Sequence, residues 1–144
     1  MQTGLLHLHS LLRWVILVLL LVSIYTTYKA SNNLNKKWWL FTLIATHVML
    51  LIGLYQVYNQ YTNAVGSGFS MADIMKTKAL RFYIIEHPLL MIIATVLITL
   101  AYRYTKSAKY KGATVLYIVA LAIILSAIPW PFRADVGRHL MPGM

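Results

Sequence analysis

The sequence contains no cysteine, so disulfide bonds, thiolate catalysis, Fe–S clusters and thiolate-bound metals are excluded. Acidic residues are nearly absent: Asp73, Glu86 and Asp135 are the three among 144 residues. Charged residues make up 11% of the chain, where about a quarter is usual in soluble domains. With 60% hydrophobic residues, this composition excludes an ordinary soluble domain and a disordered chain.

The excess of basic residues has a different meaning here than in a soluble chain. The net charge is +10, and Lys and Arg lie at the edges of long apolar runs. Membrane proteins carry their positive charges in these places. We therefore expect anionic lipid headgroups, and not nucleic acid, to be the partner of this charge.

Four apolar runs are long enough, at about 20 residues, to cross a bilayer as helices. They cover about residues 5–25, 38–58, 82–104 and 113–130, and aromatic residues flank them. Short polar linkers at residues 29–37 and 105–112 favour antiparallel neighbours. The sequence predicts an all-α protein with a single domain over residues 1–144. That domain is an integral membrane four-helix bundle of up-down-up-down topology.

Local signals refine this prediction. Ser70 and Asp73 have the spacing of a capping box, so a helix is expected to start near Met71. Pro129 and Pro131 are expected to end the fourth span. One face of the bundle carries seven Lys and Arg residues and the other carries five. This bias predicts that the face with seven is cytoplasmic and that both termini lie outside the cytoplasm.

Ionisable residues inside the spans are the candidate functional residues, because such groups are costly in lipid. They are His7, His9, Arg13, His47, Glu86 and His87. A rise of about 1.5 Å per residue places His9 and His87 at the same depth on the outer side. The first and third spans lie diagonally in an up-down bundle, so these two imidazoles are expected to face each other. His47 is expected near the mid-plane, and His7 at the headgroups.

Helical stripes predict which faces pack inward. In the first span, the stripe of His9 has polar content and that of His7 is apolar, so His9 is expected inward and His7 outward or at the interface. The two stripes are Arg13, Ile16, Leu20 and Ser23 for His9, and Leu11, Trp14, Val18 and Leu21 for His7. In the third span, the stripe of His87 contains Ala94 and Ala101, and small residues of this kind mark a packing face. In the second span, Thr46, Gly53 and Gln56 share such a face beside His47.

Two imidazoles from opposite sides of a bundle core can provide both axial ligands of a haem iron. We therefore assign His9 and His87 as axial metal ligands, with His47 as a second-choice ligand or a proton or quinone contact. The cations on the same side are Arg81, Arg133, Arg138 and Lys78. Of these, Arg81 and Arg133 are assigned to the haem propionates. Arg13 either joins them or pairs with Glu86.

Structural explanations stay open for each of these residues. His9 can be an interfacial histidine, and Glu86-His87-Pro88 can be a cluster that satisfies a proline kink. His47 can form a plain hydrogen bond between helices. His139 is expected to be solvated. A cofactor-free accessory subunit of a larger membrane complex is therefore the alternative function. A proton-handling transporter with Arg13, Glu86 and His47 as its relay is a weaker third hypothesis.

Several motifs also resemble a known family. They are Gly4–Trp14 (GLLHLHSLLRW), Thr46-His47 with Ile52–Gln56 (IGLYQ), Arg81-Phe82 leading to Glu86-His87-Pro88, and Ile128–Arg133 (IPWPFR). Together they resemble small bacterial four-helix membrane proteins labelled "cytochrome b", over nearly the whole chain. The arrangement is also loosely similar to one half of haem A synthase, in which a haem-ligating His lies beside a Glu.

The resemblance implies a b-type haem and electron transfer rather than a stand-alone enzyme. Since those relatives are bacterial, it also implies a bacterial inner (cytoplasmic) membrane, with both termini periplasmic. We further expect a respiratory or other membrane complex as a partner, and quinone as a further candidate ligand.

Overall fold

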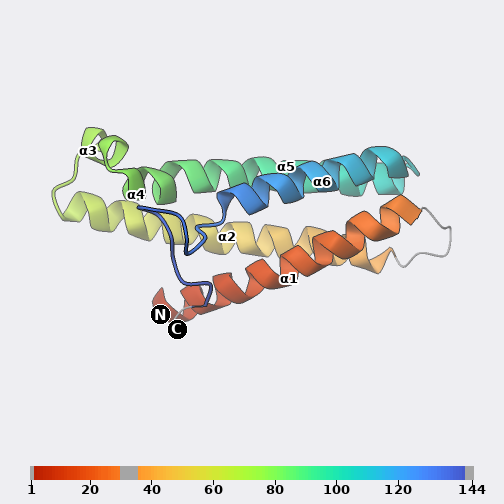
Figure 1. Ribbon diagram of the computed structural model, residues 1–144, viewed down its shortest axis with the longest axis horizontal. Helices are drawn as coiled ribbons and strands as arrows, with labels where there is room; N and C mark the ends of the chain where they lie inside the picture. The colour runs from red at the N-terminus through yellow and green to blue at the C-terminus, as the bar shows by residue number, and fades with distance from the viewer. Residues whose placement is uncertain (1, 30–35, 142–144) are drawn as a thin grey trace.

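The computed structural model describes residues 2–29 and 36–141 (Figure 1), so most of the predicted linker at 29–37 lies outside the described residues. All regular elements within these ranges are helical. They are α1 (Gln2–Lys29), α2 (Lys37–Gly66), α3 (Met71–Lys76), α4 (Lys78–Arg81), the π-helical turn η1 (Phe82–Glu86), α5 (His87–Lys106) and α6 (Tyr110–Ala127).

In the described part of the chain, four helical runs are long and apolar enough to cross a membrane. They are α1, α2, the continuous run Lys78–Lys106 formed by α4, η1 and α5, and α6. These runs indicate a multi-pass membrane protein and confirm the four predicted apolar helices. The predicted bounds were too short for the first three: α2, for example, continues to Gly66 instead of ending near residue 58. The fourth was predicted about three residues too late.

The long helices form a bundle in which each contacts two others (Figure 1). Helix α1 packs on α2 and α6, and α5 packs on the same two helices. Consequently α1 and α5 lie on opposite sides of the bundle, as the diagonal arrangement of the first and third spans predicted.

Small side chains let α5 and α6 approach closely. Ala94 and Ala101 on α5, with Ala113 and Ala120 on α6, are at most 1% exposed. Small residues on facing stripes are typical of helix contacts in membranes. The predicted packing face of the third span, on the stripe of His87, is therefore confirmed.

The two faces of α1 also follow the prediction. Ile16, Leu20 and Ser23, on the stripe of His9, are buried. By contrast, Leu11 and Val18, on the stripe of His7, are more than half exposed. Apolar side chains on an outer surface are what a lipid-facing helix requires, because lipid is as apolar as they are.

Hydroxyl groups tie the helices together at the end of the bundle where α1 ends and α6 begins. Thr114 of α6 donates a hydrogen bond to Thr27 of α1 (2.9 Å). The Ser23 and Thr42 hydroxyls, on α1 and α2, are 2.8 Å apart. Trp39 Nε1 donates to Thr26 Oγ1 at 3.0 Å. The candidate site lies at the opposite end of the bundle.

The start of α3 and the end of α6 lie where the sequence signals predicted them. The Ser70–Asp73 capping box forms as predicted: Asp73 N donates to Ser70 Oγ, and Ser70 N donates to the Asp73 carboxylate. Two hydrogen bonds to the Asp73 carboxylate lower the pKa of Asp73. The larger effect comes from the Ser70 hydroxyl and the smaller from the Ser70 backbone N–H. Helix α6 ends at Ala127, ahead of Pro129.

Pro88 has no amide hydrogen to donate, so it interrupts the α-helical bonding of the third span. The turn before it, η1, is a π-helix in which His87 N bonds to the Phe82 carbonyl. Single π-helical turns are frequent at functional sites. In this case the turn lies directly before His87.

Candidate functional site

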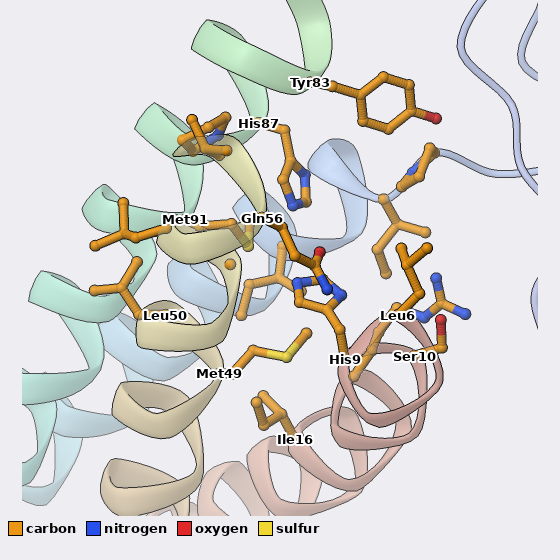
Figure 2. A pocket seen from close by; sticks show the side chains of 18 of the residues that line it. Leu6, His9, Ser10, Ile16, Met49, Leu50, Gln56, Tyr83, His87 and Met91 are labelled. Carbon is orange, nitrogen blue, oxygen red and sulfur yellow. The ribbon is translucent and has the colours of Figure 1, made fainter. Parts of the chain in front are cut away.

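A cavity of about 410 Å³ lies between α1, α2 and α5 and is covered by the stretch that follows α6. Its volume is within the range of about 300–1,000 Å³ that ligand and cofactor pockets occupy. The walls are mostly aliphatic side chains and Met, as Figure 2 shows. Polar groups that reach it include His9 and Arg13 of α1, Gln56 of α2, His87 of α5 and Arg138 of the tail.

His9 and His87 project into this cavity from the opposed helices α1 and α5 (Figure 2). The centroids of their rings are 6.3 Å apart, and the ring planes are inclined by 55°. The prediction from helical rise that these two residues lie at one level is therefore confirmed in the folded chain.

A backbone carbonyl fixes the proton of His87. Its Nδ1 lies 2.9 Å from the carbonyl oxygen of Ala127, the last residue of α6. A carbonyl only accepts, so Nδ1 carries the hydrogen and Nε2 keeps its lone pair. Metal-binding histidines are commonly oriented in this way, with the second nitrogen bonded to a carbonyl or carboxylate.

Gly53 of α2 lets the His9 ring pack close to the α2 backbone. A Cβ atom built on Gly53 would lie 3.6 Å from His9 Nε2, so the ring lies directly against the α2 backbone. The Gln56 side chain, one turn further along α2, donates to the Leu5 carbonyl on α1 (3.1 Å). The predicted packing face of the second span, through Thr46, Gly53 and Gln56, is confirmed as cavity lining.

The separation of the imidazoles fits a metal centre held between them. A metal lies about 2.0–2.1 Å from an imidazole nitrogen. The centroid of an imidazole ring lies about 1 Å beyond the nitrogen that binds the metal. Two imidazoles bound on opposite sides of one metal therefore have centroids roughly 6 Å apart. The observed 6.3 Å agrees with this value. The described residues contain no group of three or more His, Cys, Asp or Glu side chains able to hold a metal ion, so His9 and His87 stand as a pair.

The tail, residues 128–141 after α6, packs across the cavity and places Arg138 in its lining. Arg13 donates a hydrogen bond from Nη2 to the Leu140 carbonyl, and Tyr83 donates one to the Val136 carbonyl. The Arg138 guanidinium lies 4.0 Å above the centre of the Tyr83 ring. His139 is exposed, as predicted, and lies at the cavity rim.

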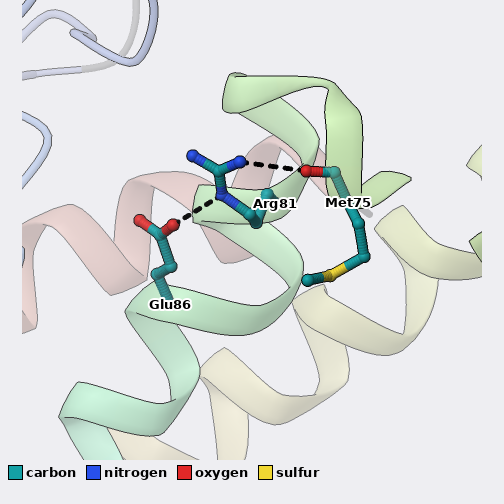
Figure 3. Close-up of polar contacts among 3 residues, drawn as sticks. All are labelled: Met75, Arg81 and Glu86. Atoms are coloured by element: carbon teal, nitrogen blue, oxygen red, sulfur yellow. Dashed lines mark hydrogen bonds and ion pairs between the residues drawn. The ribbon is translucent and has the colours of Figure 1, made fainter. Parts of the chain in front are cut away.

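Arg81 and Arg133, the predicted propionate partners, do not line this cavity. Arg81 is bound locally, as Figure 3 shows: Nε pairs with Glu86 at 2.8 Å, and Nη1 donates to the Met75 carbonyl at 3.0 Å. Arg133 donates to the Ser126 carbonyl and lies over the Phe82 ring. The π-turn explains the Arg81–Glu86 pair, because five residues complete about one π-helical turn.

The suggested Arg13–Glu86 pair is therefore wrong: Glu86 pairs with Arg81, and Arg13 bonds to the tail. The assignment of His47 to the cavity is also corrected. Its side chain is exposed, and its Nδ1 lies 2.8 Å from the carbonyl of Leu43 in its own helix. The stripe through Thr46 and Gly53 faces inward, so the adjacent His47 points outward.

Sequence reasoning did not assign Arg138, Tyr83, Met49 or Met91 to the site, although all four line it. Met91 had a signal, because it shares the helical stripe of His87. Arg138 was counted among the cations on the side of His9 and His87, but its entry into the cavity depends on the path of an irregular tail. Tyr83 lies in the π-turn η1, where counting along a regular helix gives no signal for its direction.

Comparison of the chain with protein-family models, with curated proteins and with solved structures finds no match.

Proposed function

We propose that this chain is a membrane-embedded b-type haem protein that takes part in electron transfer, with His9 and His87 as the axial ligands. One observation carries the proposal: two imidazoles from opposed helices meet 6.3 Å apart in one cavity. The bundle would have up-down-up-down topology in a bacterial inner membrane, with both termini periplasmic. The resemblance to "cytochrome b" proteins supports the same function.

A porphyrin suits this site better than a bare metal ion. Two protein ligands leave most coordination positions of a metal unfilled, and the described residues offer no third His or acidic ligand beside them. A haem brings the remaining ligands with it and supplies one-electron redox chemistry. The chain's part is to bind, orient and enclose it: Ala127 sets the tautomer of His87, and aliphatic walls keep water away.

The test is the visible spectrum of the detergent-purified protein after reduction. Wild-type protein is expected to show the sharp bands of a low-spin haem. His9→Ala and His87→Ala should each lose them while the protein remains in the membrane. His47→Ala is the matched control, because that ring lies outside the cavity, and its spectrum should be unchanged. A wild-type spectrum without a low-spin haem band would reject the proposal.

The alternative is a cofactor-free accessory subunit of a larger respiratory or other membrane complex, and His47 favours it. The His47 imidazole is exposed in the interior of a long apolar helix and, in the part of the chain that the structure describes, has no partner on its outer side. Such groups are costly against lipid. A neighbouring subunit would cover it. Under this function, a defined partner copurifies and no haem absorbs. Under the haem function, by contrast, His47 would contact a quinone or a redox partner.

A further inference from the structure

Two arginines reach the histidine cavity, and neither is paired with an acidic side chain. The guanidinium groups of Arg13 and Arg138 come from α1 and from the tail, and both residues line the cavity. Both lie within electrostatic range of His9 and His87. The site therefore holds two fixed positive charges beside its imidazole pair.

The chain has no acidic side chain left to neutralise them. Asp73 is bound in the capping box with Ser70, Glu86 pairs with Arg81, and Asp135 pairs with Lys78 at 3.3 Å. These are all the acidic residues in the sequence. An anion for Arg13 and Arg138 is therefore expected to come with a ligand.

Arg13 also has an unused donor that points to such a ligand. Its Nη2 donates to the Leu140 carbonyl, but its Nε is buried and has no hydrogen-bond partner among residues 2–29 and 36–141. A buried donor without a partner destabilises the folded protein, because its hydrogen bond to water is lost and not replaced. Charge-assisted hydrogen bonds to a carboxylate would remove this cost.

The tail is built to hold Arg138 at the cavity. Gly137 N donates to the Arg133 carbonyl (2.9 Å), and Arg138 N donates to the Pro129 carbonyl (3.0 Å). A Cβ on Gly137 would approach the Arg133 and Trp130 carbonyl oxygens to 2.6 and 2.7 Å, so only glycine fits this turn. The turn directs the next residue, Arg138, over Tyr83.

We propose that Arg13 and Arg138 form a carboxylate-binding site that takes the propionate groups of the cofactor, in place of Arg81 and Arg133. This inference rests on the proposed haem function. It predicts that the protein distinguishes a porphyrin with free carboxylates from the same porphyrin with esterified ones.

The experiment is an absorption titration of haem-free protein in detergent with haem and with haem dimethyl ester. Wild-type protein should bind haem more tightly than the ester by roughly ten-fold or more, since hydrogen bonds between charged groups are the strong ones. Arg138→Gln should bring the two affinities close together, and Arg13→Gln should do the same. Arg138→Lys should restore part of the difference.

Arg133→Gln is the matched control, because Arg133 also lies in the tail region but does not line the cavity, and its guanidinium is bound to the Ser126 and Ile128 carbonyls. It should keep the wild-type preference. If Arg138→Gln and Arg13→Gln both keep that preference as well, the carboxylate site is rejected while the haem proposal stands. If neither porphyrin binds the wild-type protein, the haem proposal itself fails, and this inference fails with it.

Discussion

At the scale of single residues, what the cavity can bind depends on which ring nitrogen of His87 carries the hydrogen and which keeps its lone pair. The Ala127 carbonyl decides this, because it can only accept. Helix α6 contributes no ionisable residue to the site, yet the carbonyl of its last residue orients His87 on α5. The end of α6 at Ala127, ahead of Pro129, is what leaves that carbonyl free to accept.

Gly53 tests whether the space beside His9 is needed for a ligand. Gly53→Leu would fill the space against His9 Nε2, where even a Cβ reaches 3.6 Å. Overpacking costs about 1–3 kcal/mol, so haem affinity should fall roughly ten-fold or more. Gly53→Ala is the control: its methyl group lies at ordinary contact distance, and affinity should change little. Equal haem content in Gly53→Leu and wild-type protein would show that the cofactor does not occupy this space.

At the scale of elements, the hydroxyl bonds at the far end hold the bundle in register. Thr114→Val removes the α6–α1 hydrogen bond but keeps the side-chain shape. Hydrogen bonds between membrane helices contribute on average about 0.6 kcal/mol, so thermal stability in detergent should fall by that order. Thr99→Val is the control, because the one bond of its hydroxyl within the described residues is to the Thr95 carbonyl of its own helix. A loss no greater in Thr114→Val than in the control would contradict this role.

The capping box of α3 makes a separate prediction about pH. Because the pKa of Asp73 is lowered in the folded state, its contribution to α3 is present at neutral pH. It is lost as the pH falls through that lowered value. Ser70→Ala should speed hydrogen exchange in α3 roughly five-fold at neutral pH, from the about 1 kcal/mol of an N-cap. Unchanged exchange in α3 would show that the box does not hold this helix.

Helical periodicity predicted the elements and the buried faces, but not the path of the tail. A residue's position along a helix fixes its depth and face, which is why His9 and His87 were predicted to meet. Arg81 and Arg133 were misplaced for a different reason. The π-turn before Pro88 and the tail both depart from regular helix, so counting residues along a straight helix misplaces side chains there.

At the scale of the whole molecule, orientation can be tested because the sequence has no cysteine to interfere. Ser67→Cys lies between α2 and α3, and Ser107→Cys lies between α5 and α6. With both termini periplasmic, a membrane-impermeant maleimide added to periplasm-accessible cells should label Ser67→Cys and not Ser107→Cys. The opposite pattern would invert the proposed topology, and labelling of both in intact membranes would reject a spanning bundle.

The proposed function requires that one iron is held by one imidazole from α1 and one from α5. Pulsed electron paramagnetic resonance of the oxidised protein, purified with ¹⁵N-labelled histidine, measures this directly. We expect couplings from two histidine nitrogens to the iron, reduced to one in His9→Ala protein that is reconstituted with haem. A wild-type signal with no histidine coupling, or with coupling that survives loss of both His9 and His87, would contradict it.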